Sequence, residues 1–381
     1  MESSNEILRC HICAAAAPIS FPNYGRLARV TSDCAPWPAG GALAICSKCG
    51  SIQKSIDAVW RSEISQIYAN YRIYHQSNGA EQPVFTADGG RTRSCILASR
   101  LTEVLNLSPR GRLLDVGCGN GAFIREFGRV RNQWTLSGSE LNEINRSVVE
   151  SIPNVESFYT CPLPEISRSF DLITMVHVLE HIPDPKVMLS IVREMLTENG
   201  RLIIEVPDCI RNPFDLLVAD HSTHFTAGSL RRLIEATGFQ VEHLGEGWIP
   251  KELTLVARPS LPVDAPSPSI ADDSSCVEAH LRLLEETIAL GRKLEQEDGF
   301  GVFGTSIAGV WLFGALSGSP KFFVDEDLQR AGRDLMGRPV FSPEATPSAS
   351  HVLIALPPPI CNRVAEKMTT KRPDVFWVTP E

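Results

Sequence analysis

The sequence lacks a long apolar run, and this excludes a membrane-spanning class of protein. No stretch of its 381 residues approaches the ~20 consecutive apolar residues that a transmembrane helix needs. The first six residues, Met1-Glu2-Ser3-Ser4-Asn5-Glu6, also lack the basic and apolar regions of a signal peptide. Hydrophobic residues make up 43% and charged residues 21% of the chain, which is typical of a globular protein. We therefore expect a cytoplasmic protein without membrane contact.

The chain also lacks an excess of positive charge. Its formal net charge is −9, and its basic residues form only short clusters such as Arg91–Arg93 and Arg231–Arg232. A nucleic-acid binder needs a basic patch large enough to outweigh that negative field. We therefore expect no nucleic-acid partner.

The composition divides the chain into three parts. Its length exceeds that of one ordinary domain. The first part is rich in cysteine, and the second alternates short apolar strands with amphipathic helices. A proline- and serine-rich linker, residues 258–268, precedes an expected helix at 277–297 and a further strand–turn–helix pattern. The sequence predicts an α/β chain with a cysteine-rich module at 1–75, a core at 76–258 and a third domain at 259–381.

The cysteines favour a metal site over disulfides. There are eleven, an odd number, and four of them form two Cys-x-x-Cys pairs near the N-terminus. Two residues between thiolates let both sulfurs turn onto one ion, and two such pairs complete a tetrahedron. His11 and Cys34 are possible substitute ligands, and four unrelated thiols are the alternative interpretation. The predicted ligands of one structural zinc ion are Cys10, Cys13, Cys46 and Cys49.

A glycine turn marks the predicted ligand site. Residues 112–116 are typical of a buried parallel strand, 117–121 read Gly-Cys-Gly-Asn-Gly, and a helix is expected from 122. Glycines let the backbone approach a ligand closely. The spacing differs from the dinucleotide pattern, and the carboxylate of Asp115 would repel a pyrophosphate. The carboxylate would suit a cationic ligand that carries an ammonium and a sulfonium. The alternative interpretation is a Rossmann-type fold that has lost its ligand.

Further strands follow at regular intervals. The second expected strand, 134–139, ends in Glu140, 25 residues after Asp115. An acidic residue at that distance can accept hydrogen bonds from both ribose hydroxyls. The third strand would end near 158–163, where an adenine could lie, and the fourth and fifth follow at 170–176 and 200–207.

Together these runs resemble the class I S-adenosylmethionine-dependent methyltransferases over about residues 95–258. The resemblance implies a Rossmann-like core that binds S-adenosylmethionine. It implies that Asp115 and the glycine turn hold the methionine part, that Glu140 holds the ribose, and that His177 lies near the sulfonium. It also implies adenine contacts near the end of the third strand. The expected cofactor-binding residues are Asp115, Gly117, Gly119, Asn120, Glu140, Leu141, Thr160, Cys161 and His177.

Two histidines follow the fifth strand, within residues 214–226. Methyl transfer needs mainly in-line positioning, but a weakly acidic acceptor must also lose a proton. Histidine titrates near neutral pH and suits that task. We expect His221 to be the general base, Asp220 to orient it, and His224 to lie beside it. Glu180 and His181 are expected to be structural, as is Thr226 if it caps the helix that follows.

The order of parts resembles a three-domain group with a four-cysteine zinc module, a class I core and a C-terminal Rossmann-like domain. Its best-known members are sugar C-methyltransferases that act on nucleotide-linked keto-deoxysugars. Residues 74–77 match the group's Tyr-His-Ser-Ser segment, and 219–226 match its His-Glu-His-x-Ser-Tyr-Phe-Ser segment. The resemblance makes Tyr74 a substrate or proton-transfer residue. His224 replaces the group's tyrosine and Ala219 its first histidine, which leaves the sugar substrate open.

The C-terminal part contains a second glycine turn, at residues 303–309, and a strand that ends in Asp325. It could hold the nucleotide end of a substrate, or it could be a structural lid. The leading expectation is methyl transfer to a small-molecule acceptor, at the carbon beside the ketone of a nucleotide-linked sugar. The alternatives are O-methylation of a hydroxyl or acid group on a sugar or natural product, and a non-catalytic zinc-bearing scaffold. The sequence does not indicate the oligomeric state.

Overall fold

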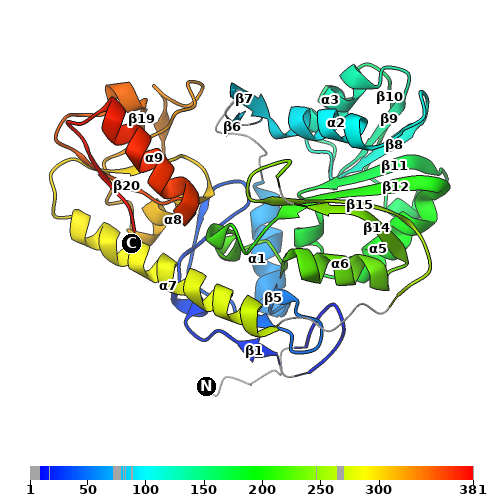
Figure 1. Cartoon of the computed structure of the whole chain (residues 1–381), viewed down its shortest axis with the longest axis horizontal. Helices are drawn as coiled ribbons and strands as arrows, with labels where there is room; N and C mark the ends of the chain where they lie inside the picture. Colours follow the sequence, from blue (N-terminus) through cyan, green and yellow to red (C-terminus); the bar gives the residue numbers. More distant parts are fainter. Residues whose placement is uncertain are drawn as a thin grey trace.

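The computed structural model describes residues 9–16, 18–71, 79, 81, 83–86, 89–245, 247–263 and 270–380. Two α/β units lie side by side, and a small N-terminal module lies below and between them (Figure 1). Helix α7 (Ile270–Leu294) runs along the lower edge from the module to the C-terminal unit. No helix among these residues is long and apolar enough to cross a membrane.

The N-terminal module has a small sheet that a distant part of the chain completes. Its elements are β1 (Ile19–Ser20), η1 (Tyr24–Arg26), β2 (Arg29–Val30), β3 (Pro36–Trp37), β4 (Leu43–Ile45), β5 (Ile52–Lys54) and α1 (Ala58–Ala69), and the strand that joins them is β13 (Thr223–His224). The order in this sheet is β1-β4-β5-β13. Thr223 pairs with Gln53 and His224 with Ile52, so the backbone of the module holds the segment that carries the two histidines.

The central unit is built on a seven-stranded sheet of order β10-β9-β8-β11-β12-β15-β14. The strands are β8 (Arg112–Val116), β9 (Thr135–Ser139), β10 (Val155–Tyr159), β11 (Phe170–Val176), β12 (Leu196–Pro207), β14 (Phe239–Gly245) and β15 (Glu252–Pro259). β15 runs antiparallel to both of its neighbours, and the other six strands run in one direction. The order reverses at β8, so the loops after β8, β9, β11 and β12 gather at one edge, where ligands bind in such sheets.

Helices cover both faces of this sheet (Figure 1). They are α2 (Arg93–Val104), α3 (Ala122–Val130), α4 (Arg146–Glu150), α5 (Pro185–Met195) and α6 (Ala227–Ala236), with short 3-10 turns η3 (Leu163–Glu165), η4 (Leu179–His181) and η5 (Pro213–Leu217) and a hairpin of β6 (Pro83–Thr86) and β7 (Gly89–Thr92). The predicted cap of α6 is confirmed, because Thr226 and Ser229 form a capping box. This cap fixes where the chain turns from the histidine segment into the helix.

The C-terminal unit has a second Rossmann-like sheet, of order β18-β19-β17-β16-β20-β21. Its elements are β16 (Phe300–Phe303), α8 (Ile307–Ala315), β17 (Phe322–Val324), β18 (Asp334–Leu335), β19 (Arg338–Phe341), η6 (Pro343–Ala345), β20 (His351–Ile354), α9 (Pro358–Lys371) and β21 (Phe376–Val378). The strands are parallel except β18. The expected α/β pattern of this part is therefore present.

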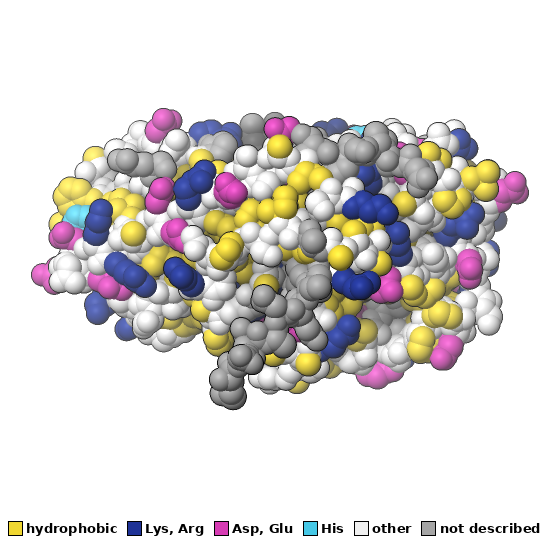
Figure 2. All heavy atoms as spheres, turned by 90° about the horizontal axis from the view of Figure 1, so that it is seen from below, with side chains coloured by type: hydrophobic (Ala, Val, Ile, Leu, Met, Phe, Trp, Pro, Cys, Tyr) yellow, Lys and Arg dark blue, Asp and Glu magenta, His cyan; other side chains and the backbone are white. Residues whose placement is uncertain are grey.

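One hydrophobic core joins all three parts. It contains Tyr24 of the module, Phe214 of the central unit and Trp311 of the C-terminal unit, all buried. The indole nitrogen of Trp311 donates to the carbonyl of Ala28 at 2.9 Å, and its ring lies 5.7 Å from that of Phe214. Figure 2 shows one face of the molecule, on which cationic and anionic side chains are interspersed among apolar ones.

Candidate active site

The glycine turn after β8 has a backbone conformation that lets a ligand approach closely. Gly117, Gly119 and Gly121 have φ angles of 67°, 54° and 75°, in the left-handed region that favours glycine. A Cβ at Gly117 would lie 2.5 Å from Cγ2 of Val178, in the segment after β11. The turn therefore lies directly against the start of η4.

Asp115 lies at the base of this turn. Its carboxylate is buried and accepts a hydrogen bond from the Thr174 hydroxyl at 2.6 Å. Burial, opposed in part by that hydrogen bond, raises the pKa of Asp115 to about 7. A cationic ligand beside the carboxylate would favour its charged form.

Glu140, at the end of β9, lies next to the same turn. Its carboxylate accepts the N–H of Gly119 at 2.7 Å and that of Leu141 at 2.9 Å. The amide of Asn120 donates to the Gly79 carbonyl at 2.7 Å, so Gly79 lies beside the turn. An open glycine backbone between two carboxylates fits the ammonium and ribose of S-adenosylmethionine.

The remaining predicted cofactor residues lie at the end of β10 and beside β9. The Thr160 hydroxyl donates to Glu143 at 2.7 Å, and Cys161 is exposed. The side chain of Leu141 is 81% exposed. These positions lie at the edge of the sheet where the resemblance places the adenine.

His177 follows β11 in a left-handed conformation, with φ of 54°. Its ring lies between two carboxylates, with Nδ1 3.2 Å from Glu180 and Nε2 3.0 Å from Glu252. Burial lowers the pKa of His177, but the charge of Glu252 and the two hydrogen bonds raise it to about 10. The contact between His177 and the sulfonium, which the resemblance implies, stays a prediction. Glu252 could not be predicted as a partner of His177, because it lies 75 residues further along the chain.

His221 lies beside a different carboxylate from the one predicted. Its Nδ1 is 2.7 Å from Asp215, whereas Asp220 accepts the N–H and hydroxyl of Ser32 at 2.9 and 2.5 Å. Asp220 also lies 3.4 Å from Nδ1 of His181. The predicted pairing of His221 with Asp220 is therefore corrected to Asp215, six residues before it in the same segment. A buried Asp–His pair holds the ring in one tautomer, with Nε2 as its free nitrogen.

His224 and Tyr74 are the other two predicted catalytic residues. Nδ1 of His224 is 2.7 Å from the second oxygen of Asp215. The residue is fully buried, and burial lowers the pKa of His224 to about 4. In this position it helps to hold Asp215, and its Nε2 is buried without a hydrogen-bond partner among the described residues. Tyr74 lies outside the described residues.

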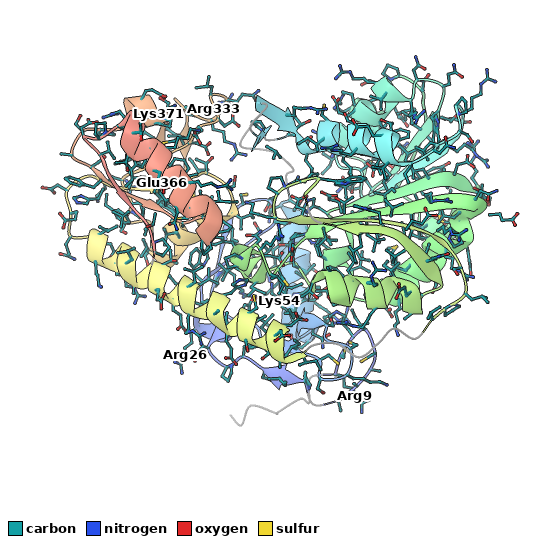
Figure 3. The ribbon with its side chains drawn as sticks, in the orientation of Figure 1. Arg9, Arg26, Lys54, Arg333, Glu366 and Lys371 are labelled. Atoms are coloured by element: carbon teal, nitrogen blue, oxygen red, sulfur yellow. The ribbon has the colours of Figure 1, made fainter. Side chains whose placement is uncertain are left out.

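The N-terminal module holds the histidine segment from several sides. Trp60 Nε1 donates to the Ala219 carbonyl at 3.2 Å, and Ala219 N–H donates to the Val30 carbonyl at 2.8 Å. The ammonium of Lys54 donates to the carbonyl of Val218. Lys54 lies near the middle of the molecule, close to helix α1 (Figure 3). The module thus shapes the loop that presents His221.

The four predicted zinc ligands come together. One sulfur from each of Cys10, Cys13, Cys46 and Cys49 lies within 4.8 Å of the others. The Sγ atoms of Cys10 and Cys49 are 3.6 Å apart, and those of Cys13 and Cys46 are 3.5 Å apart. Zinc–sulfur bonds of about 2.3 Å in a tetrahedron place the sulfurs about 3.8 Å apart. The cluster could therefore hold a zinc ion.

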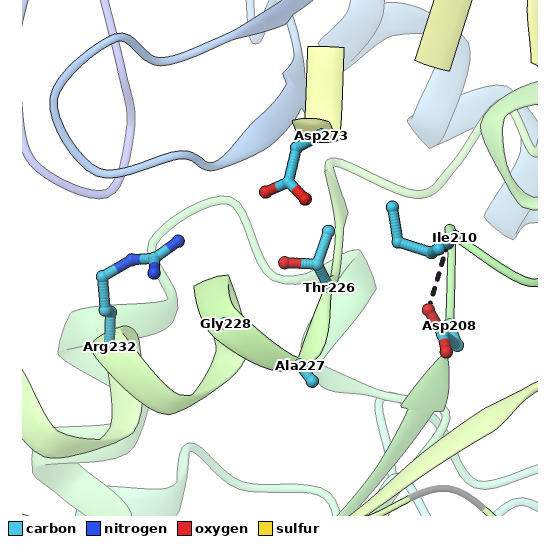
Figure 4. A pocket seen from close by; sticks show the side chains of 7 residues that line it. All are labelled: Asp208, Ile210, Thr226, Ala227, Gly228, Arg232 and Asp273. Carbon is cyan, nitrogen blue, oxygen red and sulfur yellow. Dashed lines mark hydrogen bonds between the residues drawn. The ribbon is translucent and has the colours of Figure 1, made fainter. Parts of the chain in front are cut away.

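Two hollows lie away from the glycine turn. One of about 330 Å³, near the start of α6, is lined by Asp208, Arg232 and Asp273 among others (Figure 4). The other, of about 380 Å³, lies between the module and the C-terminal unit and includes Cys34 and Arg330 in its lining.

Comparisons with known proteins agree with this geometry. Residues 90–244 match the family described as "Methyltransferase domain". A ubiquinone biosynthesis O-methyltransferase of Xanthomonas axonopodis pv. citri is 28% identical over 152 residues, which are 38% of this chain and 60% of that protein. One of Pseudomonas fluorescens is 29% identical over 127 residues, 31% of this chain and 53% of that protein. The chain thus spans less than two thirds of these relatives.

Solved structures with a similar fold include an S-adenosylmethionine-dependent methyltransferase from Mesorhizobium loti. It is 19% identical, with a TM-score of 0.36, and the match covers 42% of this chain and 96% of that one. A second, from Clostridium acetobutylicum, is 14% identical with a TM-score of 0.37, over 52% and 99% of the two chains. Residues 90–244 are thus similar in sequence to a methyltransferase domain, and the central sheet has a Rossmann-like strand order.

Proposed function

We propose that the chain transfers the methyl group of S-adenosylmethionine to a small-molecule acceptor that must first lose a proton. One observation carries the proposal: the glycine turn, its two carboxylates and the His221–Asp215 pair all follow strands that end at one edge of one sheet. Bound S-adenosylmethionine supplies an electrophilic methyl group. Asp115 would hold its ammonium and Glu140 its ribose.

His221 would accept the proton of the acceptor. Its Nδ1 hydrogen bonds to Asp215, so Nε2 carries the lone pair. For a carbon beside a ketone this creates the nucleophile, because such carbon acids are weak. Asp220 acts on the same site indirectly, through Ser32 and His181.

The acceptor that we propose first is a nucleotide-linked keto-sugar. The hollow between the module and the C-terminal unit lies next to Thr305 and Arg330, and Arg330 donates to the Thr305 hydroxyl at 2.8 Å. Arg330 lies between β17 and β18 and also pairs with Asp327 at 3.7 Å, and a guanidinium in this position suits a phosphate. Residues 32–35 reach from Asp220 to this hollow, and so link it to the site of His221.

O-methylation is the second candidate function. The relatives named above are O-methyltransferases of ubiquinone biosynthesis, and a hydroxyl acceptor would use the same base. The four-cysteine cluster would hold a structural zinc ion in either case.

The experiment combines binding and turnover. We expect S-adenosylhomocysteine to bind the protein in calorimetry, and Glu140→Ala to weaken that binding. With a panel of keto-sugar nucleotides and hydroxylated acceptors, His221→Asn should lower kcat by about 10²–10⁴-fold, the usual contribution of a general base. The matched variant His351→Asn, on β20 of the C-terminal unit, should keep full turnover.

Three outcomes are decisive. Failure of S-adenosylhomocysteine to bind would refute the methyltransferase proposal and favour a scaffold. Unchanged turnover in His221→Asn would refute the base. NMR of the product would separate a C-methyl from an O-methyl group, and so decide between the two acceptor classes.

A further inference from the structure

Three side chains at the proposed catalytic site meet as metal ligands do. One potential ligand atom from each of Glu180, His181 and His221 lies within 4.8 Å of the other two. We propose that these residues bind one divalent transition-metal ion that in turn binds an oxygen of the acceptor. The proposal rests on the proposed function, since the acceptor is what the ion would activate. It is a separate site from the four-cysteine cluster.

Both imidazoles have Nδ1 beside an oxygen that can accept its proton. Nδ1 of His221 lies 2.7 Å from Asp215, and Nδ1 of His181 lies 3.1 Å from the carbonyl of Asp220 and 3.2 Å from the hydroxyl of Tyr68. A ring whose Nδ1–H donates to an oxygen has its lone pair on Nε2. Metal-binding histidines nearly always make such a bond to a carboxylate or a backbone carbonyl. Both outer partners are thus already in place.

Glu180 supplies an independent indication of a ligand. Its side chain is 1% exposed, and one oxygen lies 3.2 Å from Nδ1 of His177. The other oxygen, Oε2, is buried and has no hydrogen-bond partner among the residues that the structure describes. A buried carboxylate oxygen without a partner costs free energy, and a bound cation removes that cost.

The two segments that carry the ligands are fixed to each other. Ser222 donates its backbone N–H at 2.7 Å and its hydroxyl at 3.1 Å to the carbonyl of Glu180. The rings of His181 and His221 meet edge to face, with centroids 4.6 Å apart. The ligands therefore converge without a rearrangement of the backbone, which a metal site of useful affinity needs.

A neighbouring trio with the same spacing, Asp215, His221 and His224, does not compete for the ion. Its atoms are already joined by the two 2.7 Å hydrogen bonds that Asp215 accepts. In a metal-loaded site, Asp215 would be the outer partner that orients His221, and His224 would hold Asp215 in place.

The ligand set indicates the kind of ion and its chemistry. Two imidazoles and a carboxylate favour ions such as Zn²⁺, Co²⁺ or Fe²⁺ over Mg²⁺ or Ca²⁺. Three protein ligands leave open positions for an acceptor oxygen. A hydroxyl bound there loses its proton to solvent more readily. The oxygen then bonds to the methyl carbon, the carbon–sulfur bond breaks with its electron pair on sulfur, and one proton is released per turnover.

This arrangement changes the role of His221. When the ion is bound, Nε2 of His221 is a ligand and the ion takes over the activation of the acceptor. Either a hydroxyl or a ketone oxygen of the acceptor could bind the ion.

Cobalt(II) is the probe that tests the site. Full-length protein with zinc in the four-cysteine cluster is titrated with Co²⁺ alone and followed by visible absorption. We expect one Co²⁺ per chain with d–d bands but without the thiolate-to-cobalt charge transfer that a cysteine site would show. His181→Gln, His221→Gln and Glu180→Gln should each abolish these bands, and Asp215→Asn should weaken Co²⁺ binding about 10–100-fold. His351→Gln is the matched control and should bind Co²⁺ as the parent does.

Binding of S-adenosylhomocysteine to each variant shows that it is folded and keeps the two proposals apart. Loss of the Co²⁺ bands with retained S-adenosylhomocysteine binding supports the metal site. Two results would overturn it: parent protein that takes up no Co²⁺ outside the cysteine cluster, or bands that persist in the three ligand variants. Either result leaves the methyl-transfer proposal intact, since that depends on S-adenosylhomocysteine binding and on turnover.

Discussion

At the scale of single residues, Asp115 is the side chain on whose charge the proposed cofactor binding depends most. The pKa of Asp115 in the free protein is raised to about 7, chiefly by burial. A ligand ammonium binds the charged form, so below pH 7 the protein must lose a proton before it binds. We predict that the affinity for S-adenosylhomocysteine falls about tenfold per pH unit below about pH 7 and is level above it. Calorimetry from about pH 5.5 to about pH 8.5 measures this dependence of the affinity on pH.

The matched variants separate Asp115 from other carboxylates. Asp115→Asn should bind weakly at every pH, with no slope. Asp171→Asn changes an aspartate in the central sheet that accepts the backbone N–H of Arg112, at the opposite end of the strands. It should keep the slope of the parent protein. A slope that survives in Asp115→Asn would contradict the role given to this residue.

Local sequence identified some of these residues and could not identify others. The positions of Asp115 and Glu140 beside the glycine turn could be predicted, because residues at the ends of neighbouring parallel strands meet at one edge of a sheet. The partner of His221 could not be predicted. Asp215 and Asp220 are both close to it in sequence, and only the fold decides which carboxylate faces the ring. Glu180 was expected to be structural, since nothing in the chain places it beside His221.

At the scale of elements, the glycine turn and η4 are fitted to each other. A Cβ at Gly117 would lie 2.5 Å from Val178. The φ of Gly117 is +67°, a conformation that is strained for residues other than glycine. We predict that Gly117→Ala lowers the free energy of unfolding by about 1–2 kcal/mol from the backbone and by about 1–3 kcal/mol from the overlap. In the double variant, Val178→Ala should recover only the part of the unfolding free energy that is lost to the overlap. Denaturant unfolding of the two single variants and the double variant measures the coupling.

The control for this cycle is a glycine of similar conformation with free space around it. Gly337 has a φ of +73°, and no atom lies within 4 Å of a Cβ built there. Gly337→Ala reports the backbone cost alone and should show no coupling to Val178→Ala. Additive effects of Gly117→Ala and Val178→Ala would mean that the turn and η4 do not constrain each other.

The regular elements follow from local patterns, and the sheet of the module does not. Strands β8, β9 and β11 were predicted within one or two residues, because apolar runs ending in glycine or acid are strong signals. Strand β13 has two residues and pairs with β5 about 170 residues earlier in the chain. A strand that short carries no periodicity, so only the tertiary structure defines it.

At the scale of the whole molecule, the three parts share the structure that presents His221. The module holds residues 216–220 through the backbone and through Trp60 and Lys54. The C-terminal unit packs against the module through α8, where a Cβ at Gly314 would lie 2.8 Å from Pro36. Composition could predict three parts, but not that one core runs through all of them, because that contact depends on residues distant in sequence.

This shared core makes a prediction about cooperativity. Trp311 is fully buried between the module and Phe214, so Trp311→Ala should cost about 3–5 kcal/mol. Hydrogen exchange should then rise in residues 213–224 as well as in α8, because the support of the histidine segment is weakened. Trp377 is only partly buried, and its indole donates to Arg372 within the C-terminal unit. Trp377→Ala should therefore raise exchange in that unit alone. If Trp311→Ala leaves residues 213–224 as protected as in the parent, the histidine segment is supported by the module without the C-terminal unit.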